Sequence, residues 1–200
     1  MGLYETGHAA CLVLKSRVFD DGFGPRETNQ RTSRSIPVNC VLTQGRPRGS
    51  SMQIVIDTRP DDVLRLEHLL EGYNYTVWIN TYGPLGINQT LEEVLRSSVS
   101  KDCVVGNTTS VSVEDARSQV LELLLHTGDG GYGPLDLLTK RSEILSLAEA
   151  LFQSVNLDQA ENVASFWLAK GHPACPVFWE FSFDIHTLRQ RWILMGSSSD

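Results

Sequence analysis

The sequence lacks long apolar runs, paired cysteines and an excess of basic residues. No stretch reaches the roughly 18 to 20 consecutive apolar residues that a membrane-spanning helix needs. The longest early apolar run, residues 8–14 (HAACLVL), follows no basic segment, so it does not match a secretory signal peptide. We therefore expect no membrane span and a location in the cytoplasm or the nucleus.

The cysteines stand far apart, and no two of them form a CxxC pair. This spacing excludes the usual zinc finger and the dithiol redox motif, so we expect buried thiols. The four residues are Cys11, Cys40, Cys103 and Cys175. A secreted form stays open as an alternative, because glycosylation sequons begin at Asn74, Asn88 and Asn107.

Acidic residues outnumber basic ones, 24 to 17, which gives a formal charge of −7 and argues against a general nucleic-acid or anionic-membrane surface. The charge is uneven. Residues 1–50 carry a net charge of +3, which leaves −10 for residues 51–200. The arginines of residues 26–48, among them Arg46 and Arg48, predict a contact with an acidic partner or, as an alternative, with a nucleic acid. A solvated loop is the simpler explanation of these arginines.

The pattern of turn formers and apolar stretches predicts three regions. Residues 1–50 form an extension with an irregular, arginine-rich segment, residues 51–196 form an α/β core domain, and residues 197–200 form a frayed polar tail. Within the core, a strand at 52–57, a helix at 61–72 and a strand at 75–82 follow one another. We expect Asp61 to cap this helix and Gly72 to end it.

A second helix and strand follow, with Asn88 as the expected helix cap and a strand at 102–109. A further helix at 113–126 begins at the cap Ser112. This alternation predicts an α/β fold, or an α+β fold, with a mixed, mostly parallel sheet flanked by helices. Two consecutive helices are then expected, at 133–155 and 157–171.

The C-terminal part is rich in aromatic residues. Residues 174–186 alternate Trp179, Phe181 and Phe183 with other side chains, which predicts a strand, and a short strand or helical turn follows at 189–196. Aromatic residues on such a strand either build a core or, if one face is exposed, form a docking surface.

His126 and Cys175 are the candidates for catalysis, because a cysteine nucleophile needs a histidine that lowers its pKa and moves the proton. Residues 123–138 (LLLHTGDGGYGPLDLL) resemble the histidine loop of caspase-type peptidases, and residues 7–19 resemble their first strand. The family's glutamine-alanine-cysteine signature is absent, and Cys175 precedes a strand rather than ending one. The resemblance therefore implies an inactive relative.

Two further segments carry residues that could bind an ion. Asp57, Asp61 and Asp62 follow a predicted strand, where carboxylates can hold magnesium, although a cap role for Asp61 is simpler. The glycines around His126 offer a phosphate nest, but a helix precedes them, so a left-handed helix stop at Gly128 and a turn explain them better. No complete motif assigns a metal or a cofactor.

The sequence therefore favours a non-enzymatic regulatory or protein-interaction module, an adaptor or an assembly subunit. The protein would bind a partner protein or a second copy of itself. The contacts would be Trp179, Phe181 and Phe183 and the basic arm at Arg46 and Arg48. The alternatives are a Cys-His hydrolase or its inactive relative, and a nucleotide- or phosphate-handling α/β protein.

Overall fold

A computed structural model describes residues 59–128 and 131–200, all within the unit that spans Ile54–Asp200. Several predictions from the sequence lie outside the described residues. They are the N-terminal extension with Arg46 and Arg48, the strand at 52–57, and Asp57.

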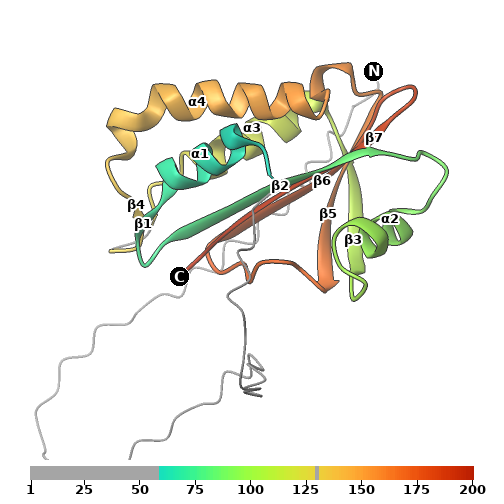
Figure 1. Cartoon of the computed structure of the whole chain (residues 1–200), viewed down its shortest axis with the longest axis horizontal. Coiled ribbons are helices and arrows are strands. Elements are labelled where there is room, and N and C mark those ends of the chain that lie inside the picture. The colour runs from blue at the N-terminus through green and yellow to red at the C-terminus, as the bar shows by residue number, and fades with distance from the viewer. Residues whose placement is uncertain (1–58, 129–130) are drawn as a thin grey trace, which may run out of the picture. The chain divides into compact units, whose positions relative to one another are not determined.

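The described fold is a five-stranded antiparallel sheet with helices on both faces (Figure 1). The strand order is β2 (Thr76–Leu85), β7 (Arg191–Ser199), β6 (Trp179–His186), β5 (Asn162–Lys170) and β3 (Val104–Val111). A separate pair joins β1 (Gly72–Tyr73) to β4 (Gly133–Pro134). The helices are α1 (Asp61–Leu70), α2 (Leu91–Ser98), α3 (Val113–Leu124), α4 (Leu137–Ser154) and the short 3₁₀ turn η1 (Leu157–Gln159).

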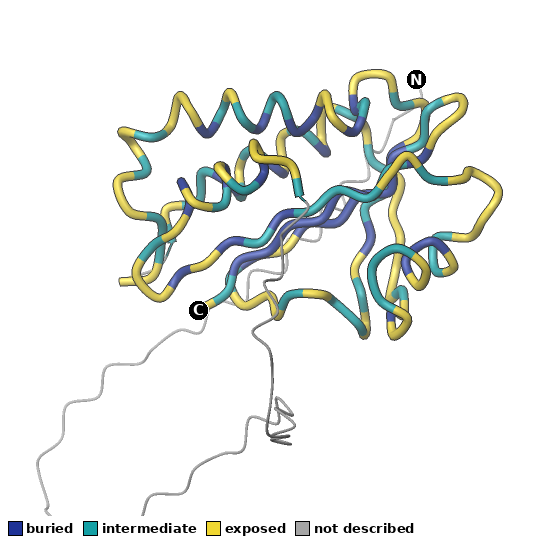
Figure 2. The backbone as a smooth tube through the Cα atoms, viewed as in Figure 1, coloured by how far each residue is buried: buried dark blue, intermediate teal, exposed yellow. Residues whose placement is uncertain are grey.

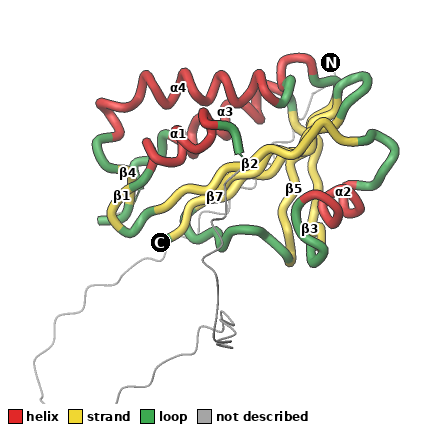
Figure 3. Tube along the Cα trace, viewed as in Figure 1, coloured by secondary structure: helices red, strands yellow, loops and turns green. Residues whose placement is uncertain are grey.

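The prediction of a mostly parallel sheet is wrong, and the fold is α+β. The strands β2 and β3 alternate with helices as predicted, but they lie at opposite edges of the sheet, and β7, β6 and β5 separate them. Residues 157–171, which were expected to be helical, form η1 and the strand β5. In β5, Val163 packs in one core while Phe166 packs in the other, so the strand is apolar on both faces and resembles helical spacing. With β5 in place, β5, β6 and β7 form an antiparallel meander. Figure 3 shows the strands of the sheet in yellow and the helices in red.

Two cores lie on opposite faces of the sheet. Helices α1, α3 and α4 cover one face, where Phe181, Phe183 and Ile144 are among the buried side chains. Figure 2 shows the buried residues in dark blue along the middle strands of the sheet. On the other face, α2 packs Val94 and Leu95 against side chains of β5 and β7. The central strands are therefore buried on both sides.

The helix ends test the predicted caps. Ser112 caps α3 as expected, because its hydroxyl accepts from the Asp115 amide at 3.0 Å. The other two assignments are wrong. Thr90, not Asn88, caps α2, and Pro60 occupies the cap of α1 without a side-chain hydrogen bond, so Asp61 lies inside the helix. Thr90 reaches the free amide of Glu93 because it stands three residues before it.

The C-terminal end is also different from the prediction. Residues 197–199 belong to the nine-residue strand β7 and pair with β2 and β6, so they are not a frayed tail. Ser197 and Ser198 are buried. Their polarity suggested a tail, but a strand between two neighbours buries its residues whatever their polarity.

Candidate functional site

The three aromatic residues assigned to docking lie in the core. Trp179, Phe181 and Phe183 are 7%, 2% and 0% exposed. Their rings stack along β6, with centroids 5.9 and 6.2 Å apart. Trp179 also donates a 2.6 Å hydrogen bond to the hydroxyl of the buried Tyr75. These side chains stabilise the fold, as the core interpretation predicts, and they offer no surface to a partner.

An exposed apolar surface lies instead where β1 and β4 meet the start of α4. Tyr73, Tyr132, Leu135 and Leu138 are 71%, 43%, 57% and 86% exposed, and we call them the tyrosine–leucine patch. The first three of them line an open groove together with Thr127, Gly131, Gly133 and Pro134. Large apolar side chains gathered in this way on a surface are typical of an interaction site.

Close backbone contacts hold the groove in place. Gly72 pairs with Pro134, and a side chain at Gly72 would come within 1.8 Å of the Gly133 carbonyl oxygen. The Leu135 amide donates to the Glu71 carbonyl at 3.3 Å. Lys140 Nζ donates to the Leu69 carbonyl at 3.0 Å, which ties α4 to the end of α1. The patch therefore lies on a fixed frame.

The glycines beside this groove serve the turn. Helix α3 ends at Leu124, two residues earlier than predicted, and Gly128 adopts the expected left-handed conformation at φ 78°. The Gly128 amide donates to Nδ1 of His126 at 3.0 Å, so this ring nitrogen is engaged within the loop. Gly128 also lies against Tyr132, where a Cβ would meet the carbonyl oxygen at 1.9 Å. These contacts support the turn over a phosphate nest.

Phe178 connects the patch to the aromatic core. Its ring lies 6.0 Å from that of Tyr132 and 5.4 Å from that of Tyr75. Val177, its neighbour, is 58% exposed. A ligand at Tyr132 would therefore contact a ring that packs on Phe178, which in turn packs on the buried Tyr75.

The candidate catalytic pair is not assembled by any contact. Cys175 is an exposed free thiol in the connection between β5 and β6, whereas His126 lies in the turn after α3. Across residues 59–128 and 131–200, no hydrogen bond or ion pair joins them. His172, the nearest histidine in sequence to Cys175, accepts at Nδ1 from the Ala174 amide at 3.1 Å. Catalysis by Cys175 stays a prediction that no contact supports.

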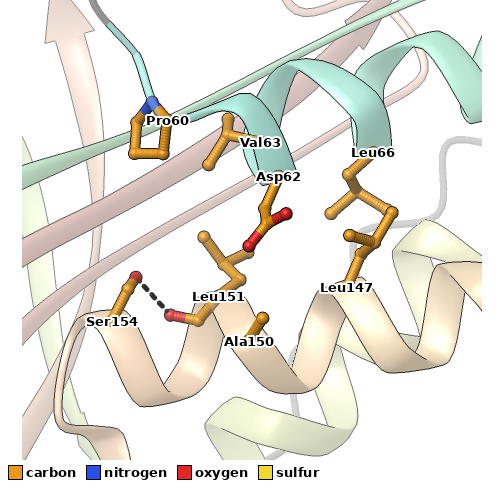
Figure 4. A pocket seen from close by; sticks show the side chains of 8 residues that line it. All are labelled: Pro60, Asp62, Val63, Leu66, Leu147, Ala150, Leu151 and Ser154. Carbon is orange, nitrogen blue, oxygen red and sulfur yellow. Dashed lines mark hydrogen bonds between the residues drawn. The ribbon is translucent and has the colours of Figure 1, made fainter.

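The acidic residues of α1 offer a poor metal site. Asp61 and Asp62 are exposed in the first turn, and the part of the chain that the structure describes holds no group of three metal-ligating side chains. Asp62 borders a narrow crevice between α1 and α4, whose other walls are mostly apolar (Figure 4). The Ser154 hydroxyl there donates to the Leu151 carbonyl at 2.7 Å. One carboxylate beside apolar side chains does not suit a cation.

A buried ion pair was missed at the sequence level. Arg191, 3% exposed, donates to both carboxylate oxygens of Asp184, 8% exposed, at 2.7 and 2.6 Å. The arginine also donates to the Gln89 carbonyl at 2.7 Å, and His186 Nε2 lies 3.0 Å from Asp184. The alternation along β6 places Asp184 and His186 on one face, but only the register of the β6–β7 hairpin brings Arg191 to them.

The similarity of the chain to known proteins is weak. No family model matches the chain, and no curated protein matches it. A crystal structure of citrus MAF1 aligns with 69% of this chain and 98% of that chain, at 14% sequence identity and a TM-score of 0.36. A similarity this low carries no argument about function. Of the described helices, none is long and apolar enough to cross a membrane.

Proposed function

We propose that the chain is a non-enzymatic protein-interaction module, an adaptor or assembly subunit, which binds a partner protein at the tyrosine–leucine patch. The observation that carries the proposal is the exposure of Tyr73, Tyr132 and Leu135 around one groove, with Leu138 exposed nearby at the start of α4. A backbone that is held in place before binding loses little conformational entropy when a partner covers it. Tyrosine also combines a large apolar area with a polar tip, which suits an interface.

The charges around the patch indicate the chemistry of the partner. Glu71 and Asp136 are exposed beside it, and residues 51–200 carry a net charge of −10. A partner that places an apolar side chain in the groove and basic residues around it would match both features. The basic arm with Arg46 and Arg48 stays a prediction, since it lies outside the described residues.

A photo-crosslinking amino acid tests the proposal in the full-length chain. Placed at Leu138, which is 86% exposed, it should capture a protein in extracts of the source cells; placed at Leu188, 75% exposed in the β6–β7 turn, it should not. The double variant Tyr73→Asp/Leu135→Asp should then lower the yield of the captured species at least about tenfold, since it desolvates charge at the centre of the interface.

Leu188→Asp is the control, because it adds one of these two negative charges at an exposed leucine elsewhere. Equal capture from positions 138 and 188, or unchanged capture in the double variant, would contradict the proposal.

A further inference from the structure

The two edges of the sheet differ in how their backbone groups are protected. At the β2 edge, the Ile79 amide donates to Glu67 at 2.6 Å and the Ile79 carbonyl accepts from Arg59 at 2.9 Å. Arg59 and Glu67 also pair with each other. An ion pair that engages the outer backbone groups blocks the addition of another strand at that point.

The β3 edge carries no such protection among the described residues. β3 pairs with β5 on one side only. Its residues are exposed, except that Val105 and Val111 are half-buried. The stretch 103–113 contains neither a charged residue nor a proline. A long, uncharged edge of this kind is a template for strand pairing.

We propose that β3 pairs with β3 of a second copy of the chain, antiparallel and about a two-fold axis, which joins the two sheets into one. The register with β5 shifts twice between Val104 and Asn107 and is regular from Asn107 to Val111. The pairing is therefore centred on Thr109, the middle of the stretch with a regular register. The self-association proposed here uses a surface distinct from the tyrosine–leucine patch.

The side chains of β3 suit a second copy as the occupant, and their lack of charge does not oppose it. Two copies of a chain with a net charge of −7 repel each other over most of their surface, but the uncharged β3 adds no like-charged contact when it meets itself. A two-fold axis brings the same strand to both sides, so every backbone hydrogen bond is made twice. In this register Thr109 meets Thr109 and Thr108 meets Ser110, which are favourable cross-strand pairs, while Asn107 meets Val111.

Sedimentation velocity of the full-length chain over a concentration series tests this inference. The wild type should form dimers by about 100 µM, and Thr109→Lys should raise the dimer Kd at least about tenfold, because the axis places the two lysines side by side. The matched control, Thr76→Lys, changes an exposed threonine on the β2 edge and should leave the Kd unchanged. Both variants lower the net negative charge, so general repulsion predicts the opposite effect.

Hydrogen exchange separates loss of pairing from loss of folding. Amides of 104–111 should gain protection as the wild-type concentration rises, while Thr109→Lys keeps protection in β6 and β7 but shows no such gain. A monomeric wild type at all concentrations, an equal effect of the two lysine variants, or protection that does not change with concentration would overturn the inference. Variants of the tyrosine–leucine patch should leave the dimer intact, so this inference and the proposed function fail independently.

Discussion

At the scale of single residues, Asp184 and Arg191 are the charged residues that are buried in the described part of the chain. Both are buried, and the guanidinium bonds the carboxylate through two nitrogens and the Gln89 carbonyl through a third. The pair thus fixes the β6–β7 hairpin to the loop that precedes α2. Its role is structural, because the bonds of Arg191 are all made within the protein.

Asp184→Ala should lower the free energy of unfolding by about 3 to 5 kcal/mol, since it leaves the Arg191 guanidinium buried without its counter-ion. Urea unfolding followed by circular dichroism measures the change. Arg65→Ala is the control, because the Arg65–Glu143 pair is about half exposed and its loss should matter little. Equal effects of the two variants would refute the structural role.

At the scale of elements, the capping box at α2 shows why position decides function. Asn88 and Thr90 are both cap-forming residue types, but only Thr90 stands three residues before Glu93, whose carboxylate returns to the Thr90 amide at 2.8 Å. These hydrogen bonds from the Thr90 backbone and side chain hold the pKa of Glu93 below its ordinary value of 4.5.

Thr90→Ala should therefore destabilise the protein by about 1 kcal/mol at neutral pH, and Asn88→Ala should change little. Because the folded state lowers the pKa of Glu93, its share of the stability is present above pH 4.5 and is lost as the pH falls through the lowered value. Thermal unfolding from pH 7 to pH 3 should show the difference between wild type and Thr90→Ala shrinking. A loss of stability in Asn88→Ala as large as in Thr90→Ala would restore Asn88 as the cap.

The sequence predicts the type of most elements but not their arrangement. Helices α1, α3 and α4 show a clear apolar stripe, and the strand signals at β2 and β6 are strong, so these elements were placed within a few residues. The strand β5 was not predicted, because it buries apolar side chains on both faces. This removes the alternation of apolar and polar residues that marks a strand. With β5 taken for a helix, the antiparallel meander was lost.

The prediction of the docking surface was wrong for a related reason. Trp179, Phe181 and Phe183 were identified as a conspicuous aromatic set, but exposure depends on what covers a strand, and helices cover this face. Conversely, Tyr73 and Tyr132 have ordinary surroundings in sequence and are 59 residues apart, and only the pairing of β1 with β4 brings them together. Long-range contacts of this kind leave no local signal.

At the scale of the whole molecule, charge divides the chain into a basic N-terminal region and an acidic remainder. The net charge of −10 on residues 51–200 opposes the approach of a nucleic acid, while seven basic residues in 1–50 favour it. Since the total charge is −7, the chain as a whole repels a nucleic acid at long distances. At physiological ionic strength, salt screens charges beyond about 8 Å. A nucleic acid in contact with the basic N-terminal residues would then be little affected by the acidic remainder of the chain.

We expect no measurable binding of a random DNA duplex at about 150 mM salt, because the excess of basic residues in the arm is only three charges and each phosphate contact adds little at that ionic strength. Fluorescence anisotropy over a salt series, with the wild type and Arg46→Ala/Arg48→Ala, measures it. Tight binding that falls steeply with salt and is lost in the double variant would show that the arm acts as a nucleic-acid contact despite the acidic remainder of the chain. Binding of equal strength in both proteins would place the contact elsewhere.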